Sequence, residues 1–272
     1  RYPPPPRMAP RAASMATATT AGATLAAEEF AAGLRPPAVV PPRPASSSCA
    51  RPAADAAALG FREVRAIHDA ETVRVYQAYN DAIADAAVAA NSFRAPMEAG
   101  LWSSTRMTWI KPSAVWMAYR CGWTTLKDKH QARVLALDVS RAGFEALLLR
   151  ASLSHGQDAV HSRSDAVRVQ WDPERVMHPQ APRSEVFTKA LTDVRSIQIG
   201  LRGPAVEVLL DPSFTLRITD VTADFRAAAC ALSASDPDLG AAAAALWPEQ
   251  QEAEMALPTA VRAALQMGPA AA

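Results

Sequence analysis

The chain of 272 residues is long enough for one main domain with additional segments, and its formal net charge of +1 is too small to attract nucleic acid or membranes over the whole surface. A local basic patch is compatible with this balance. The cysteines Cys49, Cys121 and Cys230 are widely spaced and include no CxxC pair, which argues against a disulfide framework and a cysteine zinc site. Because no apolar run approaches the roughly 20 residues of a membrane helix, no transmembrane segment is expected.

The N-terminal residues 1–57 are rich in Ala, Pro and Ser and poor in aromatic residues. Such a segment cannot bury enough apolar surface to offset the entropy lost on ordering, so we predict a disordered leader. Before Glu28 it contains Arg1, Arg7 and Arg11 and no acid, a composition that resembles an organelle transit peptide. The leader therefore predicts import into a plastid or mitochondrion; the alternative is an ordinary leader on a cytoplasmic protein.

A globular domain is predicted over residues 58–234, and it begins with two strands and a helix. The segment 62–67 alternates charged and apolar residues, and the segment 73–79 is rich in β-branched and aromatic residues. Both patterns are typical of strands. Asp81 can cap a helix over residues 82–90, whose apolar residues recur at helical spacing.

The Trp-rich stretch 106–123 follows a loop and contains a short strand and a helix. Residues 107–110 predict the strand, and Pro112 suits the first turn of a helix that continues to Arg120. Gly122 is a natural end for this helix, because glycine readily adopts the left-handed conformation of a helix C-terminus.

Later strands and helices mix without strict alternation, and several helices are short. Further strands are predicted at 133–139, 166–171, 196–201 and 214–218, and further helices after Ser140, at 185–191, at 205–210 and from Thr222 to about Leu232. This pattern favours an α+β fold: a single compact domain with a mixed, mostly antiparallel sheet, short flanking helices and disordered N- and C-terminal tails. Residues 235–272, rich in Ala and Pro, are predicted to form the C-terminal tail.

Six segments of the predicted domain carry uncommon motifs in one order. They are residues 62–68, 75–80, 106–113, 116–123, 167–175 and 195–201. Their content and order resemble the family catalogued as domain of unknown function 4291. The resemblance covers residues 61 to 232 and leaves out both ends. It implies a shared fold, and it supplies no reaction because the family has no established function.

The end of the strand at 73–79 is polar and aromatic, with Tyr76, Gln77 and Tyr79 just before a helix. A strand of this kind, then a helix, then an aromatic and basic strand, is similar to the core of ADP-ribosyltransferases, for which NAD is the substrate. That resemblance implies one polar site residue in each of three groups: residues 74–77, then Thr108 or Tyr119, then Gln170, Glu174 or Gln198. The chain departs from it in lacking a clear His-Gly-Thr or Ser-Thr-Ser motif.

Five cations are the best candidates for binding a phosphate. They are Arg106, Lys111, Arg120, Arg175 and Arg195. Arginine offers a planar fork of donors that matches phosphate, lysine adds a point charge, and the helix that follows Lys111 could contribute backbone N–H groups. The alternative is that these side chains form surface ion pairs, which contribute about 0–1 kcal/mol each.

Four of the 6 tryptophans recur every seven residues, at Trp102, Trp109, Trp116 and Trp123. Strand, helix and loop change between them, so they do not form a coiled-coil seam. The first interpretation is core packing, because Trp supplies a large buried area. The second is a stacking surface for a base or nicotinamide, where each stacked base contributes about 1–3 kcal/mol.

The predicted strand at 166–171 ends with an amide and two carboxylates, Gln170, Asp172 and Glu174. Asp172 or Glu174 could act as a general base. The alternative is turn chemistry, because an Asp-Pro pair commonly ends a strand. The loop 155–165 contains His and Asp residues without the compact spacing of zinc ligands, so no metal is expected.

Two functional hypotheses follow. The first is an enzyme acting on a nucleotide or a nucleic-acid-linked phosphate, with NAD as candidate substrate. In this enzyme Arg106, Lys111 and Arg195 would bind phosphate, and Tyr76, Tyr79 and Trp109 would frame the base. Gln77 and Gln198 would be further ligand-binding residues. The catalytic residues would be Gln170, Asp172 and Glu174. The second is a non-catalytic module that binds RNA or a protein. An enzyme needs these groups to converge in one cleft, whereas a module would spread them over an open face.

Overall fold

The computed structural model of the chain describes residues 62–125, 127–154, 166–181 and 183–267. Its strands are β1 (Arg65–Ala66), β2 (Thr72–Tyr79), β3 (Thr108–Ile110), β4 (Arg133–Ser140), β5 (Ser152–Leu153), β6 (Val167–Met177), β7 (Thr188–Leu201), β8 (Thr215–Asp220) and β9 (Ala253–Glu254). Its helices are α2 (Asp81–Ala90), α3 (Arg94–Glu98), α4 (Ala114–Cys121), α5 (Arg141–Leu149), α6 (Pro204–Glu207), α7 (Thr222–Ser233), α8 (Leu239–Leu246) and α9 (Thr259–Ala264), with short 3-10 helices η2 (Gly122–Thr124), η3 (Lys129–Gln131), η4 (Arg183–Glu185) and η5 (Val208–Leu210).

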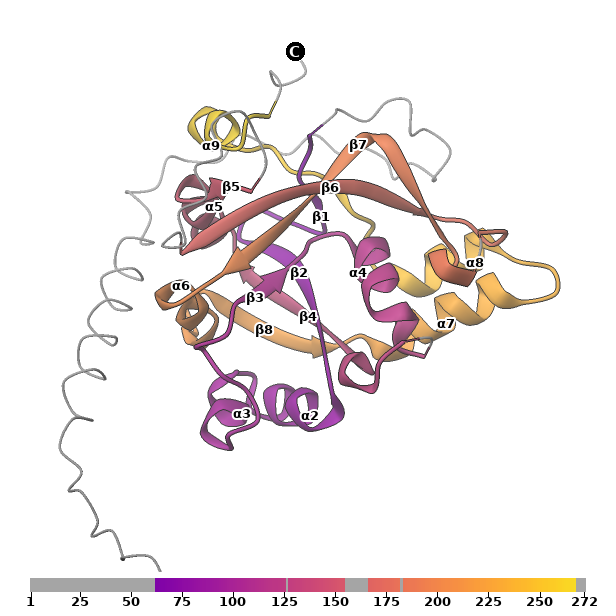
Figure 1. Cartoon of the computed structure of the whole chain (residues 1–272), viewed down its shortest axis with the longest axis horizontal. Coiled ribbons are helices and arrows are strands. Elements are labelled where there is room, and N and C mark those ends of the chain that lie inside the picture. Colours follow the sequence, from indigo (N-terminus) through magenta and orange to yellow (C-terminus); the bar gives the residue numbers. More distant parts are fainter. Residues whose placement is uncertain (1–61, 126, 155–165, 182, 268–272) are drawn as a thin grey trace, which may run out of the picture.

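The predicted α+β class is confirmed, with mostly antiparallel strands that divide into three sheets (Figure 1). The sheets have the orders β2-β4-β8, β3-β7-β6-β5 and β1-β9, and β5 pairs with β6 in parallel. The two larger sheets meet where Tyr76 in β2 and Lys111, the residue after β3, exchange backbone hydrogen bonds of 2.8 and 3.3 Å. This junction brings β2, β3 and β7 close to one another.

The central strand β4 is buried on both faces, which explains the apolar run at 134–137. The buried Asp138 that follows is paired with Arg74 and Arg217. Leu135 and Leu137 point into one apolar cluster with Phe144 of α5. Val134 and Ala136 point into a second cluster, which includes residues of α4 and α7. The three-stranded sheet is therefore covered by helices on both sides, as period-two alternation requires.

Helix α4 ends where predicted, but it begins later than predicted: Pro112, expected in its first turn, lies before the N-cap Ser113. The Ser113 hydroxyl accepts the Trp116 backbone N–H at 3.3 Å, which satisfies one of the free donors at the helix start. Gly122 ends the helix in the left-handed conformation, with φ at 60°. The core interpretation holds for Trp102 and Trp123, which are buried, whereas Trp109 and Trp116 stay partly exposed.

The region after Gln170 differs from the prediction. The strand does not end at the Asp-Pro pair: β6 continues to Met177 through a bulge after Pro173, and it forms a long hairpin with β7. The predicted helix at 185–191 is wrong, because Thr188 to Ala190 pair with Arg175 to Met177 across this hairpin. A bulge accommodates the proline, and pairing between distant segments outweighs local helix propensity.

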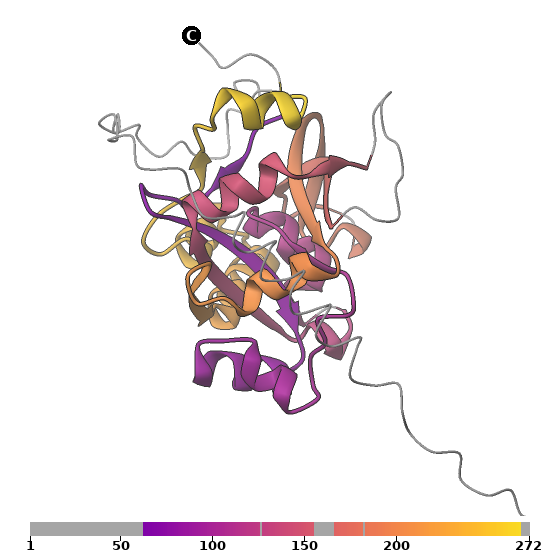
Figure 2. The same cartoon turned by 90° about the vertical axis from the view of Figure 1, so that its left-hand side faces the viewer.

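The predicted tail at 235–272 is wrong for residues 235–267. They form α8, β9 and α9, and they place Met255, Val261 and Leu265 in the core. Strand β9 pairs with β1, and α9 packs on α5 (Figures 1 and 2). Widely spaced apolar side chains in an Ala-rich and Pro-rich segment are enough to dock it, because they are buried in the core cluster of the domain.

The remaining end predictions lie outside the described residues. This holds for the leader at 1–57, so the transit peptide stays a prediction, and for residues 268–272. In the part of the chain that the structure describes, every helix is too short or too polar to cross a lipid bilayer.

Candidate functional site

A pocket of about 580 Å³ lies at the junction of the two larger sheets, between β2, β3, α4, η3 and β7. Six of the predicted site residues line it: Gln77, Tyr79, Arg106, Trp109, Lys111 and Gln198. We call it the Trp109 pocket. Its other polar lining residues are Thr108, Arg120 and Gln131. The enzyme hypothesis requires the predicted site residues to converge in one cleft, and these six residues do so.

A hydrogen-bonded group from β2 and β3 holds the buried end of the pocket. The Gln77 amide Nε2 donates to Thr108 Oγ1 at 2.8 Å and to the Trp109 carbonyl at 3.1 Å. Its Oε1 accepts the Tyr79 hydroxyl at 3.0 Å, and that hydroxyl accepts Trp102 Nε1 at 3.0 Å. Because Gln77 is 2% exposed and fully bonded, it orients Thr108 and Tyr79 rather than moving freely.

Lys111 is the buried cation of the pocket. Its side chain is 1% exposed, and its Nζ lies 3.0 Å from Asp172 Oδ2 and 3.2 Å from the centroid of the Trp116 ring. Burial lowers the pKa of Lys111 to about 8, although the Asp172 carboxylate acts to raise it. The ammonium can therefore lose its proton near neutral pH, which an exposed lysine does not do.

Two predicted catalytic residues lie behind Lys111 rather than on the pocket wall. Asp172 forms the ion pair with Lys111, and Gln170 Nε2 donates to the other carboxylate oxygen of Asp172 at 2.9 Å. Alternate residues of β6 share one face, so Gln170 and Asp172 point in the same direction. They can influence a ligand through the charge state of Lys111.

Trp109 lies against a glycine of β7 that the sequence analysis did not single out. Trp109 and Gly200 are paired across β3 and β7, and a Cβ atom at Gly200 would lie 2.9 Å from the Trp109 ring. It would also collide with the side chain of Met107. An isolated glycine inside a strand pattern is the sequence signal for such a close approach.

Glu174, Tyr76 and Arg195 do not line the pocket. Glu174 accepts the Ser113 hydroxyl at 3.0 Å and the Arg175 backbone N–H at 2.8 Å, so it supports the start of α4. Tyr76 alternates with Gln77 along β2 and packs instead against Phe225. Arg195 is paired with Pro173 and lies an odd number of residues from Gln198, so strand alternation turns it to the other face.

Sequence analysis missed Glu252, which lies in the segment predicted to be a tail. Its Oε1 accepts the Ala114 backbone N–H at 2.7 Å and Trp247 Nε1 at 3.3 Å, at the first turn of α4. Burial and, to a smaller extent, the nearby charge of Glu174 raise the pKa of Glu252 to about 8. Glu252 is therefore protonated at neutral pH, and it holds the helix that presents Trp116 and Arg120 to the pocket.

No group of His, Cys, Asp or Glu side chains within residues 62–125, 127–154, 166–181 and 183–267 could hold a metal ion. The His-bearing loop at 155–165 lies outside these ranges. Burial raises the pKa of the Cys121 thiol to about 11, so Cys121 stays a neutral, structural thiol.

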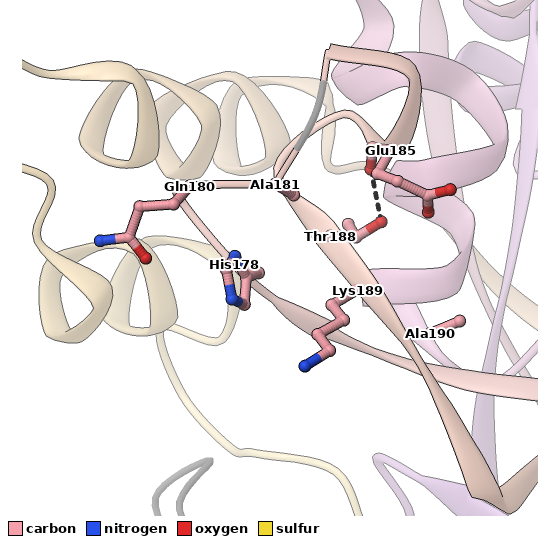
Figure 3. Close-up of a pocket in the computed structure, with 7 residues that line it drawn as sticks. All are labelled: His178, Gln180, Ala181, Glu185, Thr188, Lys189 and Ala190. Atoms are coloured by element: carbon pink, nitrogen blue, oxygen red, sulfur yellow. Dashed lines mark hydrogen bonds between the residues drawn. The ribbon is translucent and has the colours of Figure 1, made fainter.

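A second hollow of about 410 Å³ lies at the turn of the β6–β7 hairpin (Figure 3). It is lined by His178, Glu185, Thr188 and Lys189, among others, and Thr188 Oγ1 donates to the Glu185 carbonyl at 2.6 Å. None of the predicted site residues enters it. The Trp109 pocket, with its buried lysine and converging amides, is therefore the candidate functional site.

Comparison with known proteins adds a family and no activity. Residues 63–252, more than half of the chain, match the family model described as Domain of unknown function (DUF4291). The match continues beyond residue 232, where the motifs recognised in the sequence ended, and includes α8. No curated protein and no solved structure matches the chain.

Proposed function

The chain belongs to the family described as Domain of unknown function (DUF4291), and we propose that it is a nucleotide-binding enzyme that uses NAD as an ADP-ribosyl donor. The observation that carries this proposal is the position of Gln77, Thr108 and Gln198. One comes from each of the three groups that the resemblance to ADP-ribosyltransferases singled out, and all three line one pocket.

The pocket also suits the parts of a dinucleotide. Its volume falls in the range of about 300–1,000 Å³ that is usual for small-molecule sites. Trp109 and Trp116 offer partly exposed rings for stacking nicotinamide or adenine. Arg106 and Arg120 are exposed, whereas Lys111 is buried, so the two arginines lie at the pocket opening and suit the pyrophosphate.

Gln198 provides free hydrogen-bonding capacity for the ribose. Gln198 makes no side-chain hydrogen bond with any described residue, so its amide is available to a ligand. Thr108 Oγ1 accepts from Gln77 and is also hydrogen-bonded to Tyr79, so Thr108 shapes the pocket wall beside Gln198. A half-buried amide such as that of Gln198 can orient a sugar through its hydroxyl groups.

The proposed reaction is a substitution at the anomeric carbon of the nicotinamide ribose. An acceptor hydroxyl oxygen forms a bond to that carbon while the bond from the carbon to the nicotinamide nitrogen breaks. The bonding pair leaves with nicotinamide, which departs as a neutral molecule. The neutral amine of Lys111 takes the acceptor's proton, a role that its pKa near the working pH favours.

The alternative is a non-catalytic RNA- or protein-binding module. Such a module would spread aromatic and basic groups over an open face. The polar residues of this chain converge instead around one buried, proton-exchanging lysine, which favours the enzyme.

The test is calorimetric titration of the full chain with NAD. A fragment ending at residue 234 is unsuitable, because it lacks Met255 and Leu265 of the core. We expect saturable binding that Gln198→Ala or Arg106→Ala removes and that Lys189→Ala, in the second hollow, leaves unchanged. Binding should be followed by an assay for nicotinamide release. Absence of heat at millimolar NAD, with folded protein, would refute the NAD assignment.

A further inference from the structure

Exposed basic side chains gather at the opening of the Trp109 pocket. Arg106 and Arg120 line the opening itself, and the chain segment beside it carries Lys127, Lys129 and His130. All five side chains are exposed. We call these five residues the basic rim.

Contacts between α4 and η3 hold the rim together. Arg120 Nη1 donates to Gln131 Oε1 at 2.9 Å, and Gln131 also lines the pocket. Lys127 Nζ donates to the Tyr119 carbonyl at 2.6 Å, at the last turn of α4. Lys129 belongs to η3 together with Gln131, so the bond from Arg120 to Gln131 holds η3 next to the end of α4.

The positive charge of the rim is poorly compensated by the protein. In the segment 127–130 the one acid is Asp128, and its carboxylate accepts the His130 backbone N–H at 2.9 Å. The side chains of Arg106, Lys129 and His130 make no hydrogen bond or ion pair with any residue that the structure describes. Partial burial of the Lys127 ammonium and, to a smaller extent, repulsion from Arg120 lower the pKa of Lys127. Such a surface is stabilised by a polyanion.

We propose that the basic rim binds single-stranded nucleic acid and directs its end into the Trp109 pocket, where an end hydroxyl is the acceptor of the transfer. The acceptor role rests on the proposed function, whereas binding to the rim does not. The overall charge of +1 makes this a local property of the surface rather than of the whole chain.

Two features favour nucleic acid over an acidic peptide. Arginine forks match the geometry of phosphate oxygens, and the rim leads to two partly exposed rings, Trp109 and Trp116, so one ring can stack a base of the strand while the other stacks a ring of NAD. An acidic peptide would use the cations and leave the tryptophan rings unused. A base can enter such a pocket only when it is unpaired, which selects a single strand over a duplex.

The test is fluorescence anisotropy of a labelled oligothymidylate with the full chain, at several salt concentrations. Contacts with three to four phosphates predict a slope of about −2 to −3 for log binding constant against log salt. Lys129→Glu should weaken binding at low salt by about tenfold or more and make the slope shallower. Lys189→Glu is the matched control: it makes the same charge change on an exposed lysine of the second hollow, and binding should change by less than about twofold.

The outcomes separate the two proposals. Equal weakening by Lys129→Glu and Lys189→Glu, absence of binding, or equally tight binding of polyglutamate would overturn the rim proposal. Circular dichroism verifies folding, and Lys127→Gln provides a second rim variant should Lys129→Glu not fold. Oligonucleotide binding without NAD binding would leave the rim intact and refute the proposed donor; NAD binding without oligonucleotide binding would do the reverse.

Discussion

Replacing Glu252 by Gln tests the inference that a proton on the C-terminal segment stabilises α4. Glutamine keeps an oxygen that can accept from Ala114 and Trp247, and it removes the titration. We therefore expect the variant to keep the fold at every pH where the natural chain is folded. What should change is the pH dependence of the free energy of unfolding.

The sign and size follow from the raised pKa. The pKa of Glu252 is about 8 in the folded chain against an ordinary value of 4.5, so the folded state holds more protons between these two pH values. Stability from this group is complete below pH 4.5 and is lost as the pH rises through about 8. A full pH unit inside this window costs about 1.4 kcal/mol. Because the titration is incomplete near both pKa values, the loss between about pH 5 and pH 8 is about 3.5 kcal/mol rather than the cost of three full units.

The assay is urea unfolding at several pH values from about 5 to 8. Staying below pH 8 limits the contribution of Lys111, whose lowered pKa adds stability only as the pH rises above about 8. The control is Glu254→Gln, the same change two residues away on an exposed side chain. The reasoning fails if Glu252→Gln and the natural chain lose stability equally over this range, because Glu252 would then be ionised in the folded state.

Three further predictions concern the pocket and the core. Gly200→Ala should displace the Trp109 ring, reduce NAD affinity in calorimetry and cost about 1–3 kcal/mol in urea unfolding; unchanged affinity would show that the ring position is irrelevant. Met255→Ala should destabilise the chain by about 2–5 kcal/mol in the same measurement, whereas a loss below about 0.5 kcal/mol would contradict its place in the core. Nicotinamide release should rise with pH through about 8 as Lys111 loses its proton, and Asp172→Asn should move that rise to lower pH, because Asp172 raises the pKa of Lys111. A pH profile that Asp172→Asn leaves in place would remove Lys111 from the proton transfer.

Several features could be predicted because their causes are local. Helix α4 ends at Gly122, and this signal is readable within a few residues. Strand β4 follows from an apolar run that only a strand buried on both faces tolerates. The family could be recognised from short motifs whose order does not depend on any contact.

The sequence predicted which residues are candidates for the site, but it did not predict which of their side chains point into one pocket. Gln77, Thr108 and Gln198 were chosen with alternatives such as Glu174, because residue type alone does not say which way a strand side chain points. The register of β3, β7 and β6 decides this, and it turns Gln198 toward the pocket while Glu174 supports α4. Register depends on pairing between strands far apart in the chain.

The C-terminal segment depended entirely on such distant contacts. Its Ala-rich and Pro-rich composition indicates a tail when each residue is considered with its neighbours. Met255 and Leu265 are buried because β9 pairs with β1 and α9 packs on α5. Burial in the assembled domain and, to a smaller extent, the charge of Glu174 raise the pKa of Glu252, although the hydrogen bond from Ala114 acts to lower it. Burial and pKa depend on the residues that surround a side chain in the folded domain. Composition alone therefore predicted a flexible tail, whereas packing orders residues 235–267 and places Glu252 at the start of α4.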